Sequence, residues 1–157
     1  MRNTNFLKTV FLSGLLFVAA SFIHTVQAQH APGKTELGVV LGEPTGVSLQ
    51  LWQSGTTAID GALAWSFGKH DKIHIHADYL IHNPLEVDRG SLTFYYGIGA
   101  RAILTDEARF GARIPVGLQY IIPDSRISLF FEVAPIFDLI PATDFDVNGG
   151  IGVRYFL

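Results

Sequence analysis

Residues 147–157 read VNGGIGVRYFL, and the two faces of this stretch have opposite chemistry. Side chains point alternately to the two sides of a strand. The bulky apolar residues therefore share one side: Val147, Ile151, Val153, Tyr155 and Leu157. The other side carries Asn148, Arg154 and the glycines at positions 150 and 152. A strand with one apolar face and one polar, glycine-containing face is typical of a barrel that spans a membrane.

The same alternation continues through the rest of the chain, in segments separated by turns. Clusters of Gly, Pro, Asn, Asp and Ser predict seven turns, for example at 53–55 and 123–125. The segments between these turns are eight predicted strands: 35–42, 47–53, 57–67, 72–82, 91–104, 109–122, 126–140 and 145–157. The longer strands match the roughly 9 to 11 residues that a tilted strand needs to cross a bilayer.

The predicted strand 72–82 separates its two faces most clearly. Its apolar side contains Ile73, Ile75, Ala77, Tyr79 and Ile81. Its polar side contains His74, His76, Asp78 and His82. The strands at 91–104, 109–122 and 126–140 sort in the same way. The first three strands sort less cleanly, because Val40 and Trp52 fall on the polar side.

Alternation alone does not say which face is outside, because a soluble sandwich or lipocalin also alternates, with its apolar face inward. Three features favour an apolar outside. The apolar faces are too bulky for a narrow interior, and the polar faces are rich in glycine. Aromatic residues of the apolar faces also gather near the two predicted ends of the strands, as at membrane interfaces: Trp65, Phe67, Phe110 and Phe137 at one end, and Phe94, Tyr120 and Tyr155 at the other. We therefore expect an all-β, eight-stranded, antiparallel up-and-down transmembrane β-barrel.

Residues 1–28 have the three parts of a secretory signal peptide. Arg2 and Lys8 supply positive charge, residues 10–23 are almost all apolar, and residues 26–28 (VQA) supply a cleavage site. The apolar part is shorter than the roughly 20 residues that span a bilayer as a helix. We expect cleavage after Ala28 and a single barrel domain at 29–157.

The composition excludes several other classes of protein. The chain has no cysteine, which excludes a disulfide framework, a thiolate metal site and a lipoprotein anchor. Removing residues 1–28 removes two positive charges and no acid, so the net charge of −3 becomes −5. An acidic chain with scattered Lys and Arg has no electrostatic footprint for nucleic acid.

The terminal strand resembles those of the small eight-stranded outer-membrane barrels, the group that contains the OmpA membrane domain and OmpX. The stretches 41–46 (LGEPTG) and 144–155 look like an uncharacterised branch of that group. The resemblance implies a location in the outer membrane of a Gram-negative-type bacterium, in contact with outer-membrane lipids, as a monomer. It also implies that the barrel-assembly machinery recognises the C-terminal strand. The usual terminal aromatic residue is one place early here, as Phe156, and Leu157 is last.

The same resemblance implies that both termini are periplasmic. The external connections would then be 43–46, 68–71, 105–108 and 141–144, all of them short. Long external loops carry adhesion and receptor functions, so short ones argue against both.

Two prolines fall inside predicted strands. Proline cannot donate to the hydrogen-bond ladder and is normally confined to edges and bulges. A closed barrel has no edge, so we predict β-bulges at Pro115 and Pro135.

Charged residues recur on the predicted inner faces. Five are acidic and three are arginines: Glu36, Asp60, Asp78, Glu132 and Asp138, with Arg101, Arg113 and Arg154. Charges enclosed by a barrel must be paired or hydrated. We therefore predict a salt-bridged plug that fills the interior.

The stretch 74–78 (HIHAD) places His74, His76 and Asp78 on one face, with successive side chains roughly 7 Å apart. Imidazole and carboxylate groups in this arrangement could bind Zn²⁺ or another divalent ion, with a further ligand such as Asp60. We expect instead a hydrogen-bonded interior with no metal and no cofactor.

The function expected from these features is structural or envelope-associated and not enzymatic. Three alternatives remain open: a narrow pore for small solutes, a lipid-modifying enzyme, and a soluble periplasmic barrel that binds a lipid. The enzyme would need Ser66, His70 and Asp71 to form a nucleophilic set at the outer rim.

Overall fold

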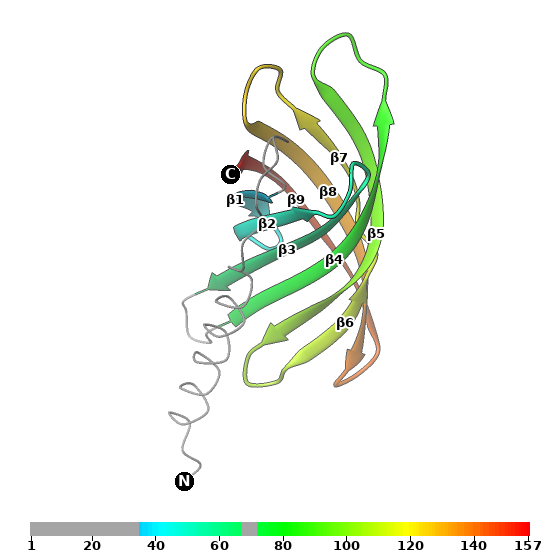
Figure 1. The fold of residues 1–157 in the computed structure, drawn as a ribbon. Coiled ribbons are helices and arrows are strands. Elements are labelled where there is room, and N and C mark those ends of the chain that lie inside the picture. The colour runs from blue at the N-terminus through cyan, green and yellow to red at the C-terminus, as the bar shows by residue number, and fades with distance from the viewer. Residues whose placement is uncertain (1–34, 67–71) are drawn as a thin grey trace. The chain divides into compact units, whose positions relative to one another are not determined.

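The computed structural model describes residues 35–66 and 72–157. These residues form nine antiparallel strands in one sheet, which confirms the all-β prediction (Figure 1). The strands are β1 (Thr35–Gly42), β2 (Gly46–Trp52), β3 (Thr57–Ser66), β4 (Lys72–Leu85), β5 (Ser91–Leu104), β6 (Arg109–Arg113), β7 (Val116–Ile121), β8 (Ile127–Ile140) and β9 (Asp144–Phe156). Within this part of the chain no helix is long and apolar enough to cross a membrane. The predicted signal peptide at 1–28 lies outside the described residues.

The sheet closes on itself through backbone hydrogen bonds. β1 pairs with β2 on one side and with β9 on the other. From β2 the ladder continues through β3 and β4 to β5, and from β9 it continues to β8. Both β6 and β7 pair with β5 and with β8, which completes the ring. Every described strand thus has a partner on each side, and the sheet has no open edge.

One predicted strand, 109–122, is two strands in the structure. β6 and β7 lie end to end between the same two neighbours and are interrupted at residues 114–115. The Gly97 amide donates to the Pro115 carbonyl at 2.9 Å, and the Ile114 amide donates to the Pro135 carbonyl at 3.0 Å. Neither proline can return a hydrogen bond, because its nitrogen carries no hydrogen. The prediction of eight strands is therefore wrong by one.

The predicted bulges at Pro115 and Pro135 are wrong. The pairing register is the same on both sides of the interruption, against β5 and against β8 alike. Pro135 itself lies within the continuous strand β8. The register shift between β6 and β8 lies elsewhere, between Phe110 and Gly111. Each proline therefore costs the ladder one donor, and no extra residue is inserted.

The connection between β4 and β5 is shorter than predicted. β4 continues to Leu85, so the connection is reduced to residues 86–90. It ends at Gly90, whose φ of 73° lies in the left-handed region that favours glycine. A longer β4 also lengthens its ladder with β5, which reaches Leu85 and Leu92.

The two faces of the sheet are sorted as the alternation predicts. Large apolar side chains lie on the outer surface, where Phe94 is 37% and Leu129 45% exposed. Charged side chains lie in the interior, where Arg101 is 2% and Arg113 1% exposed. This arrangement is the reverse of that in a soluble sandwich or lipocalin, whose apolar faces are buried.

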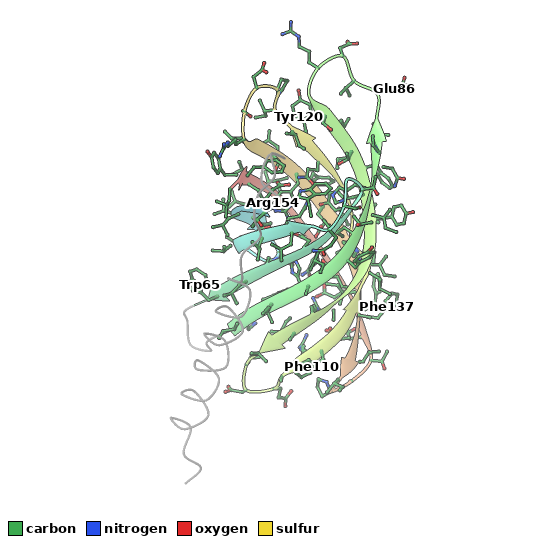
Figure 2. The ribbon with its side chains drawn as sticks, in the orientation of Figure 1. Trp65, Glu86, Phe110, Tyr120, Phe137 and Arg154 are labelled. Atoms are coloured by element: carbon green, nitrogen blue, oxygen red, sulfur yellow. The ribbon has the colours of Figure 1, made fainter. Side chains whose placement is uncertain are left out.

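Outer aromatic residues occupy both ends of the strands. Figure 2 shows Trp65, Phe110 and Phe137 toward one end and Tyr120 toward the other. Trp65 is 51%, Phe110 45% and Phe137 43% exposed. The predicted member Phe67 lies outside the described residues. The exposed aromatic side chains at one end and the half-buried Tyr120 at the other match the positions of the girdles expected at the two interfaces of a bilayer.

Glycines on the inner face make room for the charged side chains. A Cβ at Gly99 or at Gly111 would collide with the carboxylate of Asp78 or of Asp138. A Cβ at Gly117 would collide with the ring of Tyr95. The glycine-rich inner faces are therefore a condition for filling this narrow interior with large polar groups.

Candidate functional site

All eight charged residues predicted to face inward are buried in the interior. We describe them in three groups. The Glu36 cluster contains one carboxylate and neutral donors. The central cluster contains Asp60, Asp78, Glu132, Arg113 and Arg154. The Arg101 cluster joins Arg101 to Asp138.

The Glu36 cluster surrounds a fully buried carboxylate with neutral donors from several strands. Trp52 donates its indole N–H to Oε1 at 2.6 Å. The Gln119 amide donates to both carboxylate oxygens, at 3.0 and 3.1 Å. The Ser128 hydroxyl donates to Oε2, and Gln50 lies within 3.5 Å of Oε1. Among the described residues, no guanidinium group hydrogen-bonds to Glu36.

The central cluster contains two neighbouring sets of ion pairs. Arg113 donates through Nε to Asp78 Oδ2 at 2.8 Å and through Nη2 to Glu132. The Tyr95 hydroxyl donates to the second oxygen of Glu132 at 3.0 Å. Arg154 donates to Asp60 Oδ1 at 2.7 Å. These residues come from β3, β4, β5, β6, β8 and β9, so the network ties together strands from all around the ring.

Arg154 has a hydrogen-bond partner on each of its three guanidinium nitrogens. Its Nε donates to the Ser48 hydroxyl at 2.8 Å, and its Nη1 donates to Gln50 Oε1 at 2.7 Å. Its guanidinium carbon lies 3.8 Å from the centre of the Phe130 ring, a cation–π contact. Gln50 thereby links Arg154 to the Glu36 cluster.

The Arg101 cluster lies where the interior opens to solvent. Arg101 forms a two-pronged pair with Asp138, through Nε at 3.0 Å and Nη2 at 2.7 Å. Its Nη1 donates to Asp146 at 2.9 Å and to Asn148 at 3.2 Å. The Asp146 side chain is 47% exposed, so this cluster joins the buried network to the surface.

The buried charges do not balance. Among the described residues, five buried carboxylates face three buried guanidinium groups, an excess of two negative charges if all are ionised. The half-exposed Asp146 adds a further negative charge beside Arg101. A closed interior with this excess attracts cations.

The structure divides the predicted set His74, His76 and Asp78. His76 and Asp78 each offer a ligand atom, and these atoms and one from Asp60 all lie within 4.8 Å of one another. His74 is not in this group; its ring meets that of His76 edge-on, with the centres 5.8 Å apart. The third member therefore comes from the neighbouring strand β3, where Asp60 is the direct register partner of Asp78.

His82, the remaining inward histidine of β4, belongs to the Glu36 cluster. Its Nε2 lies 3.1 Å from Gln119 Oε1, and its ring packs between those of Trp52 and Tyr95. It thus connects the neutral donors around Glu36 to the tyrosine that holds Glu132.

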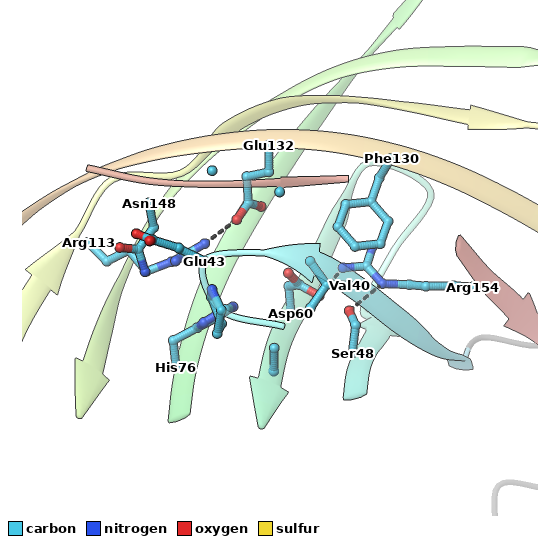
Figure 3. Close-up of a pocket in the computed structure, with 14 residues that line it drawn as sticks. Val40, Glu43, Ser48, Asp60, His76, Arg113, Phe130, Glu132, Asn148 and Arg154 are labelled. Atoms are coloured by element: carbon cyan, nitrogen blue, oxygen red, sulfur yellow. Dashed lines mark hydrogen bonds and ion pairs between the residues drawn. The ribbon is translucent and has the colours of Figure 1, made fainter. Parts of the chain in front are cut away.

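Two spaces lie beside these clusters. A small cavity of about 20 Å³, enough for one water molecule or ion, is lined by residues that include Asp60, His76, Arg113, Glu132 and Arg154 (Figure 3). A larger vestibule of about 820 Å³ is lined by His74, Arg101 and Asp146, among others. Glu43, Pro44 and Asn148 line both spaces, so the two are adjacent.

Most of the residues that sequence reasoning missed are neutral, and one, Asp146, is charged. Gln50, Gln119 and Ser128 stand on polar faces, but their composition gives no sign that they converge on one carboxylate. Asp146 was assigned to neither the charged set nor a site. The residues proposed for a lipid-modifying enzyme cannot be placed, because His70, Asp71 and the Ser66 side chain lie outside the described residues.

Comparisons with known proteins give a likeness in fold. No family model and no curated protein matches the chain. Among solved structures, the N-terminal β-barrel domain of Pseudomonas aeruginosa OprF is similar, with a TM-score of 0.56 and 13% sequence identity. The match covers 78% of this chain and 95% of that one. At this identity the likeness concerns the fold alone: the closed sheet is similar in architecture to that β-barrel.

Proposed function

We propose that this chain is an integral β-barrel protein of the outer membrane, closed by its own charged side chains, with a structural role in the envelope. The observation that carries the proposal is the sorting of the two faces. Exposed apolar residues surround the ring, and the ionised groups are inside. Monomeric soluble proteins rarely expose contiguous apolar surface on this scale, whereas a membrane-spanning barrel exposes such a surface to lipid.

The partners in this proposal are the outer-membrane lipids and the barrel-assembly machinery. β9 places Ile151, Val153 and Tyr155 on the outer face, in the alternation that the resemblance to OmpA-like barrels associates with recognition of the last strand. Export requires the predicted signal at 1–28, with cleavage after Ala28. The proposed unit is a monomer, because closure of the ring leaves no strand edge for a second copy.

A soluble lipid-binding barrel fits the interior poorly. Such a protein needs an apolar cavity inside, but the two interior spaces are lined largely by charged and polar groups. The structure also has an apolar groove of about 480 Å³ on its outer surface. This groove is lined by outward residues such as Val39, Leu118, Leu129 and Val153. An acyl chain would therefore lie outside the ring.

The proposed plug also distinguishes the structural role from the alternative function as a narrow pore. The small cavity beside the central cluster is about the size of one water molecule, and ion pairs cross the interior next to it. Reconstitution into planar bilayers should then give no reproducible conductance steps at neutral pH. Regular conductance steps would contradict the proposed plug and would show that the interior conducts.

Location and closure can be tested together. The protein should fractionate with outer membranes, remain in the pellet after carbonate extraction, and migrate faster on a detergent gel before heating than after it. Release by carbonate would contradict the proposal.

A pair of variants sharpens this test. Val133→Arg places a charge on the outer face near the middle of β8, where a membrane-spanning barrel should lose about 2–4 kcal/mol. Glu107→Arg makes a comparable change in an exposed turn and should have little effect. If both variants reach the folded, heat-modifiable form equally well, the outer face is not in lipid.

A further inference from the structure

We propose that Asp60, His76 and Asp78 form a binding site for one divalent transition-metal ion, such as Zn²⁺, inside the closed sheet. This inference goes beyond the structural role proposed above and does not depend on it. It rests on four observations: the geometry of the three side chains, their unpartnered atoms, the adjoining space and the local charge.

The strand register creates the geometry. Asp60 on β3 lies directly opposite Asp78 on β4, and His76 lies two residues before Asp78 on the same face. Their ligand atoms all lie within 4.8 Å of one another. Zinc ligands at roughly 2.0–2.2 Å from the ion are at most about 4.4 Å apart, so small side-chain rotations bring these three atoms to one ion.

Two atoms of this group are buried without a partner. Nδ1 of His76 and Oδ1 of Asp78 have no hydrogen-bond partner, although His76 is only 6% and Asp78 only 2% exposed. Buried polar atoms without partners are uncommon, and a bound ion or water is one of their standard explanations. Arg113 and Arg154 occupy only one oxygen of each aspartate, Oδ2 of Asp78 and Oδ1 of Asp60.

The adjoining cavity has the size that a single ion requires. Asp60 and His76 both line it (Figure 3). Glu132 also lines the cavity, but its two oxygens hold Arg113 and Tyr95, so one water molecule would complete a four-coordinate site. The adjacent vestibule shares Glu43, Pro44 and Asn148 with this cavity.

The charge and the donor types favour a divalent transition metal. In the central cluster three carboxylates face two guanidinium groups, so with all of them ionised the cluster carries one excess negative charge, which a cation would offset. A neutral imidazole with two carboxylates suits zinc, copper or nickel, whereas calcium and magnesium prefer all-oxygen sites.

The test uses the full protein, folded in detergent and stripped of metal with a chelator. Isothermal titration with Zn²⁺ and elemental analysis after gel filtration should both give one zinc per chain. Substitution with Co²⁺ should give visible absorption bands typical of low-coordinate nitrogen and oxygen ligation. Failure of the wild-type protein to bind stoichiometric zinc overturns the proposal, whatever the variants do.

Two histidines on one face of one strand provide a matched pair of variants. His76→Ala should abolish zinc binding, and His74→Ala should leave the stoichiometry at one. Asp78→Asn gives a second, shape-conserving test and should also abolish binding. Equal binding by His76→Ala and wild type overturns the site, as does loss in His74→Ala alone. Circular dichroism confirms that each variant is folded.

Discussion

The Glu36 cluster and the central cluster stabilise their buried carboxylates in different ways. Glu36 is surrounded by neutral donors, among them Trp52 and Gln119. Asp78 and Glu132 share the guanidinium group of Arg113. Neutral donors stabilise a charge without bringing a second one into the interior, whereas an ion pair requires both partners to lose their hydration.

The difference lies in what remains when one partner is removed. Loss of one neutral donor leaves Glu36 with its other hydrogen bonds. Loss of Arg113 leaves two carboxylates facing each other in a buried space. The central cluster should therefore be the more fragile of the two, even though it contains the stronger individual interactions.

The largest effect should come from Arg113→Met, which keeps much of the side-chain volume and removes the charge. We expect the free energy of unfolding to fall by roughly 3–5 kcal/mol, because a buried pair loses one partner. Urea unfolding in lipid vesicles measures it. The control is Arg126→Met in the exposed turn before β8, which should change stability by less than about 0.5 kcal/mol. Similar losses in the two variants would show that burial of Arg113 is not what matters.

A smaller loss should follow Glu36→Gln. Hydrogen bonds to a charged group contribute about 1.5–3 kcal/mol, and this change weakens them without stranding an opposite charge. The same unfolding experiment gives the value. Glu43→Gln, in the exposed turn between β1 and β2, serves as its control. A loss as large as that of Arg113→Met would remove the distinction between the two clusters.

The smallest effect should come from Asp146→Asn at the open end of the interior. The Asp146 side chain is 47% exposed, and Arg101 keeps its pair with Asp138, so the loss should be at most about 1 kcal/mol. It should also shrink as salt is added, because exposed charges are screened. Unfolding at low and high salt tests this point. A loss that does not depend on salt would place Asp146 with the buried groups.

Much of the fold could be predicted because period-two alternation is a local property of the sequence. It assigned Phe94 and Leu129 to the outside and Arg113 and Glu132 to the inside without any knowledge of strand pairing. The separate prediction of a β-bulge at Pro115 was wrong, because it assumed that the missing N–H of proline requires an extra residue in the strand. The structure instead gives up one ladder bond and keeps the register.

The site could be predicted only in part, because its contacts depend on register. The inward side of Asp60 and Asp78 follows from alternation, but their direct opposition depends on the alignment of β3 with β4. Gln119 reaches Glu36 across 83 positions of sequence, and no local pattern indicates that contact. The same limit applies to His74, which has the right residue type but lies outside the group of close ligand atoms.

The sorting of faces also affects how this molecule responds to temperature. Separating the strands exposes mainly hydrogen-bonding groups from the interior, and hydration of polar surface lowers the heat capacity, whereas hydration of apolar surface raises it. The interior therefore contributes a small or negative share to the heat-capacity change of unfolding. Compared with an apolar core of equal size, the polar interior makes stability depend less steeply on temperature and weakens the tendency of the protein to unfold in the cold.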